Sequence, residues 1–325
     1  METGQPYGIG AYFAYRHDPF TAMPDPEAMK RAFDKLKLLV SIDVRYSETA
    51  WYADVILPEA AYLERANILA QNNGPRPNFS MRDQAIAPRF DSRPAWWIFR
   101  EILQRMGPLG HGEALDFATI EELWDYQLDG TGITVAQMRE QGVASLAASA
   151  SITPRDKLKF KTPSGKIEID SEVLKKAGLP SLPPYQVREP TSGDHFYLLF
   201  GRVATLTHGQ SLNNPLLKEI APEQTLWIHP ERAKPLGIAD GDEVEISGGG
   251  GYSGFIKAKV TPWIHPEAVF MLHGYGATIP LATRAYGVGV ADQRLQHGKL
   301  YDYDPAGGGN AMTETIVQIK RRGAK

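Results

Sequence analysis

The sequence predicts a doubly wound α/β unit followed by a β-rich C-terminal domain. Within residues 8–57, apolar runs that suit strands alternate with helical patterns in the order strand, helix, strand, helix, strand. From residue 195 onward, short apolar runs are separated by turn signals such as Asp240-Gly241, as in a β domain. The chain has 325 residues, 42% of them hydrophobic, so it can bury the cores of two such domains.

The α/β unit is predicted element by element. Residues 8–15 predict a buried strand, and a Pro-Asp-Pro-Glu run opens an amphipathic helix over residues 24–35. Residues 37–44 are almost continuously apolar, as in a parallel strand covered on both faces, and residues 53–57 predict a third strand. Because ligands of doubly wound sheets bind at the carboxyl ends of the strands, we expect a crevice there. It would be lined by Arg16, His17, Asp43, Ser47, Glu48 and Thr49.

Three of these positions carry alternatives. Asp43 could accept hydrogen bonds from ribose hydroxyls or from a guanine edge, but it could also cap the helix that starts near Ser47. Arg16 and His17 could contact a cofactor, or they could form surface ion pairs with Asp18 or Asp25.

The chain from the third predicted strand to residue 193 is predicted to be irregular and partly helical. Residues 71–89 are interrupted by prolines and predict a loop. Residues 93–106 predict a helix whose aromatic side chains pack rather than relay electrons, and residues 119–128 predict another helix. The composition of residues 181–193 is that of a linker. We therefore predict three segments, residues 1–105, 106–193 and 194–325.

A polar loop follows the strand predicted at residues 195–202. Residues 202–214 contain no carboxylate but many groups that donate and accept hydrogen bonds, which suits a flat, anionic ligand rich in heteroatoms. The alternative is a surface loop built on Asn and Ser turns, in which His208 only shapes the loop. The candidate binding residues are Arg202, Thr205, Thr207, His208, Gln210, Ser211, Asn213 and Asn214.

The motifs that follow this loop resemble, in their order and spacing, the C-terminal domain of the molybdopterin-dependent oxidoreductases of the dimethyl sulfoxide reductase family. They are LWIHPERA (226–233), LGIADGDEVEIS (236–247), the glycine cluster 248–251, FIKAKVTPWI (255–264), VFMLHGYG (269–276), YGVGVADQRL (286–295) and DPAGGGNAMTETIVQIKR (304–321). The resemblance implies a six-stranded double-psi β-barrel that caps a bis-guanylyl molybdopterin cofactor. It also adds Gly209, Asp292, Gln293 and Asn310 to the candidate cofactor-binding residues.

The first half resembles the same family independently. SIDVRYSETAWYADVILPEAAYLER (41–65) is similar to the family's αβα cofactor domain, and KTPSGKIEI (161–169) to the segment before its last domain. YRHDP (15–19) and the HGQSLNN loop are most similar to catalytic subunits of thiosulfate, polysulfide and tetrathionate reductases. The resemblance implies that the α/β unit, with His17, Asp43, Glu48 and Thr49, holds one guanine nucleotide arm, and that the barrel loop holds the other pterin.

The chain contains no cysteine. Iron–sulfur clusters are held by thiolates, so this chain cannot hold the [4Fe–4S] cluster of the family, and it also lacks the cysteine that binds molybdenum in the sulfur-compound reductases. We therefore expect it to be the C-terminal part of a larger catalytic subunit whose N-terminal part carries the cluster. The resemblance further implies an iron–sulfur electron-transfer subunit, a membrane-anchor subunit, and a periplasmic or membrane-associated enzyme of anaerobic respiration.

Several other classes of function are disfavoured. The net charge of 35 minus 38, or −3, gives no reason to expect nucleic acid or an anionic membrane as a partner. No apolar stretch reaches the length of a membrane span, and METGQPYG does not resemble an export signal, so we expect neither in this chain. GIGAYF lacks the third glycine of a dinucleotide fingerprint, no Walker lysine motif occurs, and the histidines do not fall at metal-ligand spacing.

The resemblance thus implies the cofactor-binding part of a molybdenum oxidoreductase, with tungsten as the less favoured metal, that transfers two electrons to sulfur–sulfur bonds. No residue of this chain is expected to be catalytic or to ligate the metal. One alternative is another reaction of the same family, such as formate oxidation or arsenic oxyanion chemistry. The other is a non-catalytic module that stores or transfers the cofactor.

Overall fold

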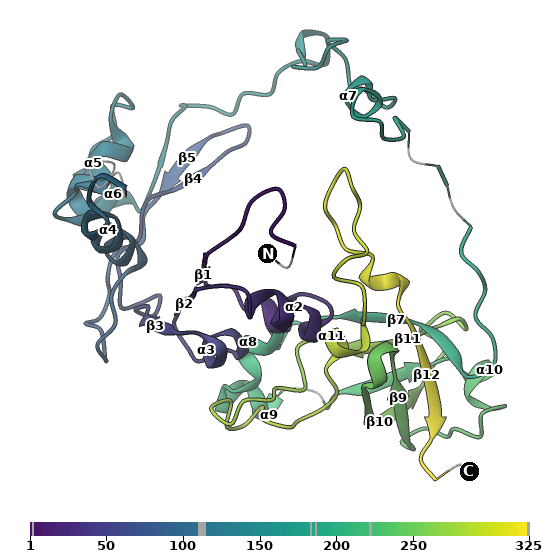
Figure 1. The fold of residues 1–325 in the computed structure, drawn as a ribbon. Coiled ribbons are helices and arrows are strands. Elements are labelled where there is room, and N and C mark those ends of the chain that lie inside the picture. The colour runs from purple at the N-terminus through teal and green to yellow at the C-terminus, as the bar shows by residue number, and fades with distance from the viewer. Residues whose placement is uncertain (2, 110–114, 183, 186, 221–222, 324–325) are drawn as a thin grey trace. The chain divides into compact units, whose positions relative to one another are not determined.

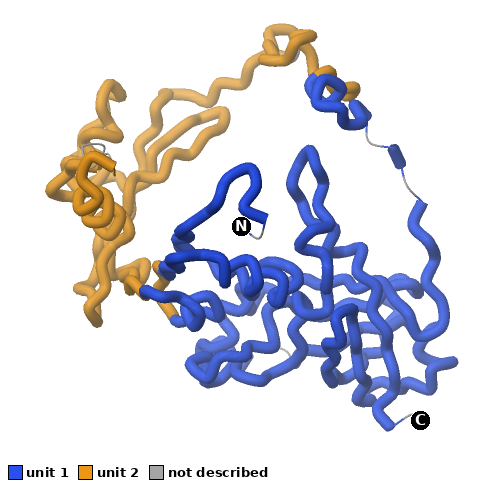
Figure 2. Tube along the Cα trace, in the orientation of Figure 1, with its two compact units in different colours: residues 1–41, 46–55, 173–325 blue, residues 42–45, 56–172 orange. Residues whose placement is uncertain are grey.

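In a computed structural model, the chain forms two compact units, which Figure 1 and Figure 2 show as a ribbon and as a coloured trace. The structure describes residues 1, 3–109, 115–182, 184–185, 187–220 and 223–323. Unit 1 contains residues 1–41, 46–55 and 173–325, and unit 2 contains residues 42–45 and 56–172. The beginning and the end of the chain therefore belong to one unit, and the three sequence-based segments remain a prediction.

The C-terminal part of unit 1 is a closed six-stranded barrel, as expected. Around the barrel the strand order is β10-β8-β11-β7-β12-β9. The pairs β10/β8 and β11/β7 are parallel, and the other four pairs are antiparallel. The strands are β7 (His195–Gly201), β8 (Thr225–Ile228), β9 (Glu243–Ser247), β10 (Ser253–Val260), β11 (Ala268–Leu272) and β12 (Ile316–Arg321).

Alternating side chains of these strands fill the barrel. Phe196 and Leu198 of β7, Val244 and Ile246 of β9 and Met271 of β11 are fully buried, since successive strand residues point to opposite faces. The sequence predicted these strands from short apolar runs between turn signals.

Short helices connect the strands. Pro230 starts one of them, since its fixed φ suits the first turn of a helix, and Gly241 makes the turn before β9 with φ of +85°. The polar loop after β7 is not a continuous loop, because it contains helix α8 and leads directly into α9. The connecting helices are α8 (His208–Leu212), α9 (Pro215–Ile220), α10 (Pro230–Ala233), η4 (Gly249–Gly251), α11 (Asp292–Leu295) and η5 (Met312–Glu314).

The N-terminal part of the chain forms a three-stranded sheet in the order β1-β2-β3. Strand β2 is buried over residues 39–42, as its apolar run predicted, whereas β1 was predicted to be buried and only Ala14 is. This sequential strand order contains no reversal, so the doubly wound arrangement stays a prediction. The elements are β1 (Ala11–Tyr15), α1 (Pro19–Ala22), α2 (Pro26–Phe33), β2 (Leu38–Asp43), α3 (Glu48–Tyr52) and β3 (Val55–Pro58).

Unit 2 is built around Trp124, which is fully buried and donates from Nε1 to the carbonyl of Asn67 at 2.7 Å. Residues 71–89 were predicted to be a loop, but cross-strand pairs such as Gln71 with Phe79 make part of them a hairpin. The predicted helices at 93–106 and 119–128 are confirmed. The elements are β4 (Ala70–Asn72), β5 (Asn78–Ser80), α4 (Ala95–Arg105), η1 (Gly107–Leu109), α5 (Ile120–Leu128), α6 (Val135–Gln141), β6 (Val143–Ser145) and η3 (Arg155–Lys157).

Helix α7 (Glu172–Lys176) precedes the predicted linker.

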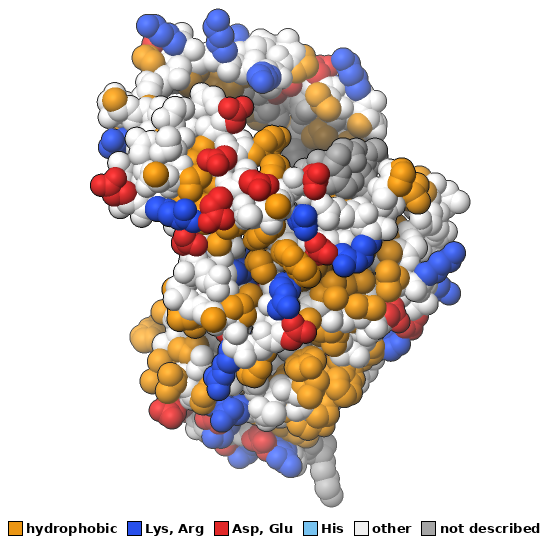
Figure 3. Space-filling view, turned by 90° about the vertical axis from the view of Figure 1, so that its left-hand side faces the viewer, with side chains coloured by type: hydrophobic (Ala, Val, Ile, Leu, Met, Phe, Trp, Pro, Cys, Tyr) orange, Lys and Arg blue, Asp and Glu red, His pale blue; other side chains and the backbone are white. Residues whose placement is uncertain are grey.

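In the space-filling view of Figure 3, acidic and basic side chains are both spread over the face, between groups of hydrophobic side chains. Among the helices that the structure describes, none has the length and apolar character needed to cross a bilayer.

Candidate functional site

A cavity of about 320 Å³ lies in unit 1 where β7 and β11 end. We call it the histidine cavity. Helix α8 of the predicted binding loop closes one side, and α11 closes another. The cavity is lined by Ala22, Phe200, Gly201, Arg202, His208, His273, Asp292, Gln293, Gln296 and Met312.

Asp292 organises this cavity from its buried side. Its side chain is fully buried, and Oδ2 lies 2.8 Å from Nδ1 of His273. The amide of Gln296 donates to Oδ2 at 3.3 Å, and the backbone N–H of Gly274 approaches Oδ1 at 3.4 Å. A buried carboxylate that accepts several hydrogen bonds holds its donors in fixed orientations, so Asp292 positions the ring of His273 at the cavity wall.

The two histidines of the cavity differ in their electrostatics. Burial lowers the pKa of His208, and nearby His273 and Arg202 lower it further. Burial alone would also lower the pKa of His273, but the hydrogen bond and the charge of Asp292 outweigh it and raise that pKa overall. The cavity therefore combines one imidazole whose pKa is lowered with one whose pKa is raised.

The rings are held in a compact group. His208 and His273 meet edge to face, with centroids 5.1 Å apart. Nη1 of Arg202 lies 3.4 Å from Nε2 of His208, which can accept a hydrogen bond when the ring is neutral. Because Arg202 is exposed, its guanidinium brings a permanent positive charge to the mouth of the cavity.

Glycines allow the loop to approach β11 this closely. A Cβ on Gly274, whose φ is +93°, would lie 2.5 Å from the backbone nitrogen of Gly209. His208 itself has φ of +48°, which is uncommon for a residue other than glycine. Such strain persists where the surroundings fix it, and it is frequent at binding sites.

Two buried acceptors at the cavity have no hydrogen-bond partner in the part of the chain that the structure describes. They are Oε1 of Gln293 and Oε1 of Gln296. A buried polar group without a partner costs about 1–3 kcal/mol, so such atoms usually mark a place for water or a ligand. A ligand with hydrogen-bond donors would fit this wall of the cavity.

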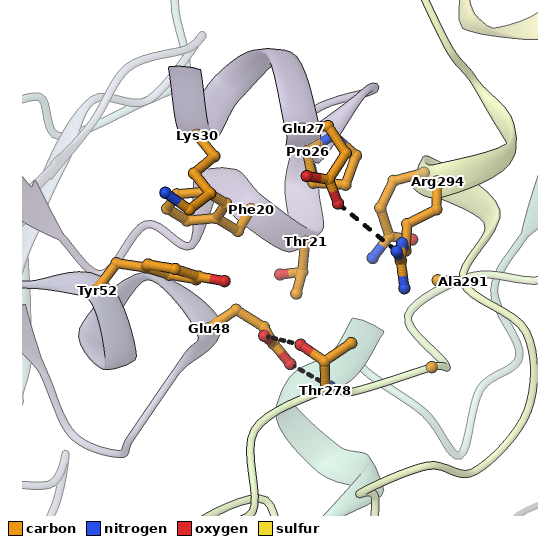
Figure 4. Close-up of a pocket in the computed structure, with 12 residues that line it drawn as sticks. Phe20, Thr21, Pro26, Glu27, Lys30, Glu48, Tyr52, Thr278, Ala291 and Arg294 are labelled. Atoms are coloured by element: carbon orange, nitrogen blue, oxygen red, sulfur yellow. Dashed lines mark hydrogen bonds and ion pairs between the residues drawn. The ribbon is translucent and has the colours of Figure 1, made fainter. Parts of the chain in front are cut away.

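A second cavity of about 220 Å³ lies between helices α1 to α3 and the loops before α11 (Figure 4). We call it the Glu48 cavity. Figure 4 shows Phe20 and Tyr52 lying against each other, with ring centroids 4.7 Å apart, and Arg294 pointing toward Glu27. The lining residues are Phe20, Thr21, Pro26, Glu27, Lys30, Glu48, Tyr52, Gly276, Thr278, Ala291, Gln293 and Arg294.

Glu48 and Thr49 connect elements of unit 1. The carboxylate of Glu48 accepts from the backbone N–H and the hydroxyl of Thr278, at 2.6 and 2.7 Å, and from Ile279 N at 3.3 Å. The hydroxyl of Thr49 is fully buried and donates to Asp18 at 2.7 Å. Both side chains were predicted to contact a nucleotide, but their hydrogen-bonding groups are used within the protein. Glu48 still lines the Glu48 cavity.

Gln293 lines both cavities. Its backbone carbonyl accepts from Asp25 N at 3.1 Å, so helix α2 holds it in place. The two cavities therefore share one wall, and a single elongated ligand could contact both.

The remaining predicted residues of the loop have other positions. Thr205 is half-buried, and Thr207 and Gln210 are exposed. The hydroxyl of Ser211 accepts from Thr207 N at 2.7 Å, so it stabilises the start of α8. Asn213 Oδ1 accepts from the backbone of Arg284 at 2.7 Å.

Four further candidates lie outside both cavities. Asn214 accepts from Leu216 N at 2.9 Å and so shapes the start of α9. Asn310 donates to the carbonyls of Lys299 and Leu300, each at 3.0 Å. His17 is exposed, with Nδ1 3.2 Å from the hydroxyl of Tyr12, and Asp43 Oδ1 accepts from Val44 N at 2.7 Å. Ser47, not Asp43, caps the helix that follows.

Sequence reasoning missed His273 and Gln296. His273 belongs to VFMLHGYG, one of the motifs that carried the resemblance, and Gln296 directly follows another, YGVGVADQRL. A polar residue at the end of an apolar strand, directly before Gly-Tyr-Gly, is the signal that could have indicated His273. No comparable signal marks Gln296, because its role depends on the distance to Asp292.

Comparison with known proteins gives the family. A model described as molybdopterin oxidoreductase matches residues 1–105, and one described as molydopterin dinucleotide binding domain matches residues 196–317. The thiosulfate reductase molybdopterin-containing subunit PhsA of Salmonella typhimurium is 31% identical over 315 residues. The chain belongs to the molybdopterin oxidoreductase family. This confirms the family inferred from the motifs.

The similarity covers most of this chain and a minor part of its relatives. The thiosulfate reductase match covers 89% of this chain and 41% of that subunit. Dimethyl sulfoxide reductase DmsA of Escherichia coli is 29% identical, over 74% of this chain and 33% of that protein. Acetylene hydratase from Pelobacter acetylenicus superposes with a TM-score of 0.81 at 20% identity, over 98% of this chain and 45% of that one, which shows the shared fold. Among the described residues of this molybdopterin oxidoreductase chain, there is no group of three or more His, Asp or Glu side chains that could hold a metal ion.

Proposed function

We propose that this chain is the cofactor-binding part of the catalytic subunit of a molybdenum enzyme that reduces inorganic sulfur compounds. The observation that carries the proposal is the histidine cavity, in which Arg202 and His208 from the predicted loop meet Asp292 and Gln293 from a separate motif. All four were candidates from the sequence, and the fold places them around one cavity.

The chemistry of the cavity fits a pterin. A pterin presents ring nitrogens, an amino group and a carbonyl, and its dinucleotide form adds phosphates. The unpartnered oxygens of Gln293 and Gln296 could accept from pterin N–H groups, while Arg202 and the protonated form of His273 could donate to anionic oxygens. The Glu48 cavity, which shares Gln293, could take the continuing arm of a dinucleotide. The bound group would supply the two-electron redox chemistry, and these residues would bind and orient it.

Finer features follow the family and are part of the same proposal. They are a cofactor in the bis-guanine-dinucleotide form, a barrel of the double-psi type, and an α/β part that belongs to a doubly wound sheet. An iron–sulfur cluster would be held by the rest of the subunit, because this chain has no cysteine. An iron–sulfur subunit and a membrane anchor would complete a periplasmic or membrane-associated enzyme of anaerobic respiration.

The substrate class rests on the relative named for thiosulfate reduction, which is 31% identical to this chain. Thiosulfate, polysulfide and tetrathionate each contain a sulfur–sulfur bond that two electrons can cleave. The test is turnover of these three compounds by the complete enzyme with reduced viologen as donor, with formate and arsenic oxyanions as comparison substrates. Turnover of only formate or only an arsenic oxyanion would refute the proposed substrate class and leave the cofactor-binding role in place.

A further inference from the structure

The turn of the β4–β5 hairpin in unit 2 contains an asparagine followed by a glycine, Asn73 and Gly74 (Figure 1). Among the asparagines of the sequence, Asn73 is the only one that precedes a glycine. Both residues are exposed, and the strands fix the ends of the turn, since Asn72 is opposite Asn78 in the register. The turn therefore places an asparagine side chain directly before a backbone N–H that no Cβ shields.

The surroundings leave this pair unrestrained. Among the described residues, none forms a hydrogen bond with the side chain of Asn73 or with the N–H of Gly74. A Cβ at Gly74 would meet no atom within 4 Å, so the space beside this residue is open. Its φ of +148° is a conformation that glycine adopts and other residues rarely do. The amide carbon of Asn73 and the nitrogen of Gly74 are therefore free to approach each other.

The other asparagines of the same region are restrained. The side chain of Asn72 donates to Oδ1 of Asn78 at 2.9 Å, and the side chain of Asn78 donates to the carbonyl of Arg76 at 3.2 Å. Oδ1 of Asn67 accepts from Nε of Arg65 at 3.0 Å. Each of these side chains is held by a hydrogen bond, and each is followed by a residue larger than glycine. Asn73 therefore differs from its neighbours both in its freedom and in the residue that follows it.

We propose that Asn73 is a site of spontaneous deamidation. The backbone nitrogen of Gly74 attacks Cγ of Asn73 and gives up its proton to a base in the solvent, while the Cγ–Nδ2 bond breaks and the amide nitrogen takes up a proton and leaves as ammonia. Water then opens the resulting cyclic imide. Cleavage of the new bond to Cγ gives aspartate, whereas cleavage of the original peptide bond gives isoaspartate, in which the chain continues through the side chain. The attack is favoured because both groups belong to one short segment of chain.

The reaction would change the hairpin turn in charge and in backbone. Both products carry a carboxylate in place of an amide, so the formal net charge of the chain changes from −3 to −4. Isoaspartate also adds a carbon to the backbone just before Gly74. The turn is in contact with a later segment of unit 2, since the carbonyl of Pro75 accepts from the N–H of Ser151 at 2.6 Å. The modified residue would therefore lie close to a contact that holds the hairpin.

The first test incubates the full 325-residue chain and a synthetic peptide of residues 66–82 side by side at mildly alkaline pH. Trypsin releases the same peptide from the chain, because Arg76 is followed by proline and is not cut. Fragmentation in the mass spectrometer then gives the conversion of each asparagine in it, Asn67, Asn72, Asn73 and Asn78. In the folded chain, Asn73 should react at least about tenfold faster than each of the others, since only its reacting groups are free to align. Its rate should be within about tenfold of its rate in the synthetic peptide.

The second test is a matched pair of variants. Asn73→Gln keeps the amide but lengthens the side chain, which moves the amide carbon out of position for ring closure, so the charge shift in isoelectric focusing should be lost. Asn72→Gln is the control and should keep the shift. An isoaspartate methyltransferase with S-adenosylmethionine should label incubated wild type and Asn72→Gln but not Asn73→Gln. Both positions are exposed, so both variants should fold, which thermal unfolding checks.

Three results would each overturn the proposal. Conversion of Asn73 no faster than that of Asn72 would mean that the pair has no special reactivity. A rate in the folded chain that falls below the stated range would mean that the fold protects the turn. A charge shift that persists in Asn73→Gln would assign the reaction to another residue. These measurements need no cofactor and no further part of a subunit, so they are independent of the proposed function.

Discussion

Nδ1 of His273 lies 2.8 Å from Oδ2 of Asp292, and this pair forms the buried wall of the histidine cavity. Asp292 is fully buried, whereas His273 also faces the cavity. The pair links the ligand-facing surface of the cavity to the interior of unit 1. Protonation of His273 therefore affects both the stability of the fold and the charge of the cavity wall that a ligand would contact.

The first prediction concerns pH and stability. Folding raises the pKa of His273 above the ordinary value of a histidine, because the hydrogen bond and charge of Asp292 outweigh the effect of burial. A group whose pKa is raised on folding stabilises the protein fully below its unfolded pKa and loses this effect as pH rises through its folded pKa. Denaturant unfolding of wild type and His273→Gln should therefore differ more at about pH 5.5 than at about pH 8.5. A difference that grows with pH would mean that the ion pair with Asp292 does not form.

The second prediction concerns Glu48 in the Glu48 cavity. Its carboxylate accepts two hydrogen bonds from Thr278, at 2.6 and 2.7 Å, and is largely buried. Glu48→Ala should lower the free energy of unfolding by about 1–3 kcal/mol, because the N–H and hydroxyl of Thr278 lose their acceptor. Glu27→Ala is the control, since Glu27 has a 65% exposed side chain 3.5 Å from Arg294. It should change stability by less than about 1 kcal/mol. Equal effects in urea unfolding would show that the bonds of Glu48 do not stabilise unit 1.

The third prediction concerns the close approach of Gly209 and Gly274. A Cβ at Gly274 would lie 2.5 Å from the nitrogen of Gly209, whereas a Cβ at Gly287 would meet nothing within 4 Å. Both glycines have positive φ, of +93° and +67°, so Gly→Ala introduces backbone strain at each. Only Gly274→Ala adds a clash, and it should cost about 1–3 kcal/mol more than Gly287→Ala in thermal or urea unfolding. A similar loss in both variants would argue against the close contact.

The fourth prediction concerns the barrel alone. All six of its strands lie between residues 195 and 321, so a chain of residues 194–325 should fold, and proteolysis should cut near residues 181–193. The barrel alone would lack two contacts with the N-terminal part of the chain. Glu48 accepts a hydrogen bond from Thr278 N, and Asp25 accepts one from Gly298 N at 2.6 Å. Exchange of the amides of Thr278 and Gly298 should therefore be faster than in the full chain. An unfolded circular dichroism spectrum would place the boundary elsewhere.

The fifth prediction concerns activity. The full 325-residue chain should not reduce thiosulfate, polysulfide or tetrathionate by itself, because it provides no thiolate for a cluster or for the metal. The assay uses reduced viologen and chain purified from cells that make the cofactor. Sustained turnover would contradict the proposal that a further part of the subunit is needed.

Local sequence patterns predicted the barrel strands and several helices, because these elements depend mainly on residues that are close together in the sequence. The turn signal Asp240-Gly241 indicated where β9 begins, and the apolar run over residues 37–44 identified β2. The burial of β1 could not be read in the same way, since exposure depends on which segments cover the sheet. The hairpin of β4 and β5 escaped prediction because three-residue strands carry too little periodicity.

The site could be predicted in part. Four residues that belong to recognisable motifs line the histidine cavity: Arg202, His208, Asp292 and Gln293. The polar side chains of Asn213, Asn214 and Asn310 have the same chemistry as ligand-binding groups, but they bond to nearby backbone instead. The residue type alone does not tell a ligand-binding side chain from one that bonds to the backbone. Both have the same hydrogen-bonding groups, and only their neighbours in the fold differ.

The most direct test of the account measures cofactor in the complete subunit with Arg202, His208 and Gln293 replaced by Ala. Each contact is worth about 0.5–1.5 kcal/mol, so three could weaken cofactor retention by roughly ten- to a thousandfold if they add. Lys257→Ala is the control, because Lys257 is an exposed barrel residue outside both cavities. Pterin, molybdenum and guanine nucleotide are measured per protein, together with thermal unfolding of the apo form. We predict a large loss of cofactor in the triple variant with little change in melting temperature, and normal cofactor content in the control. Normal cofactor content in the triple variant would contradict the assignment of the histidine cavity as the pterin site.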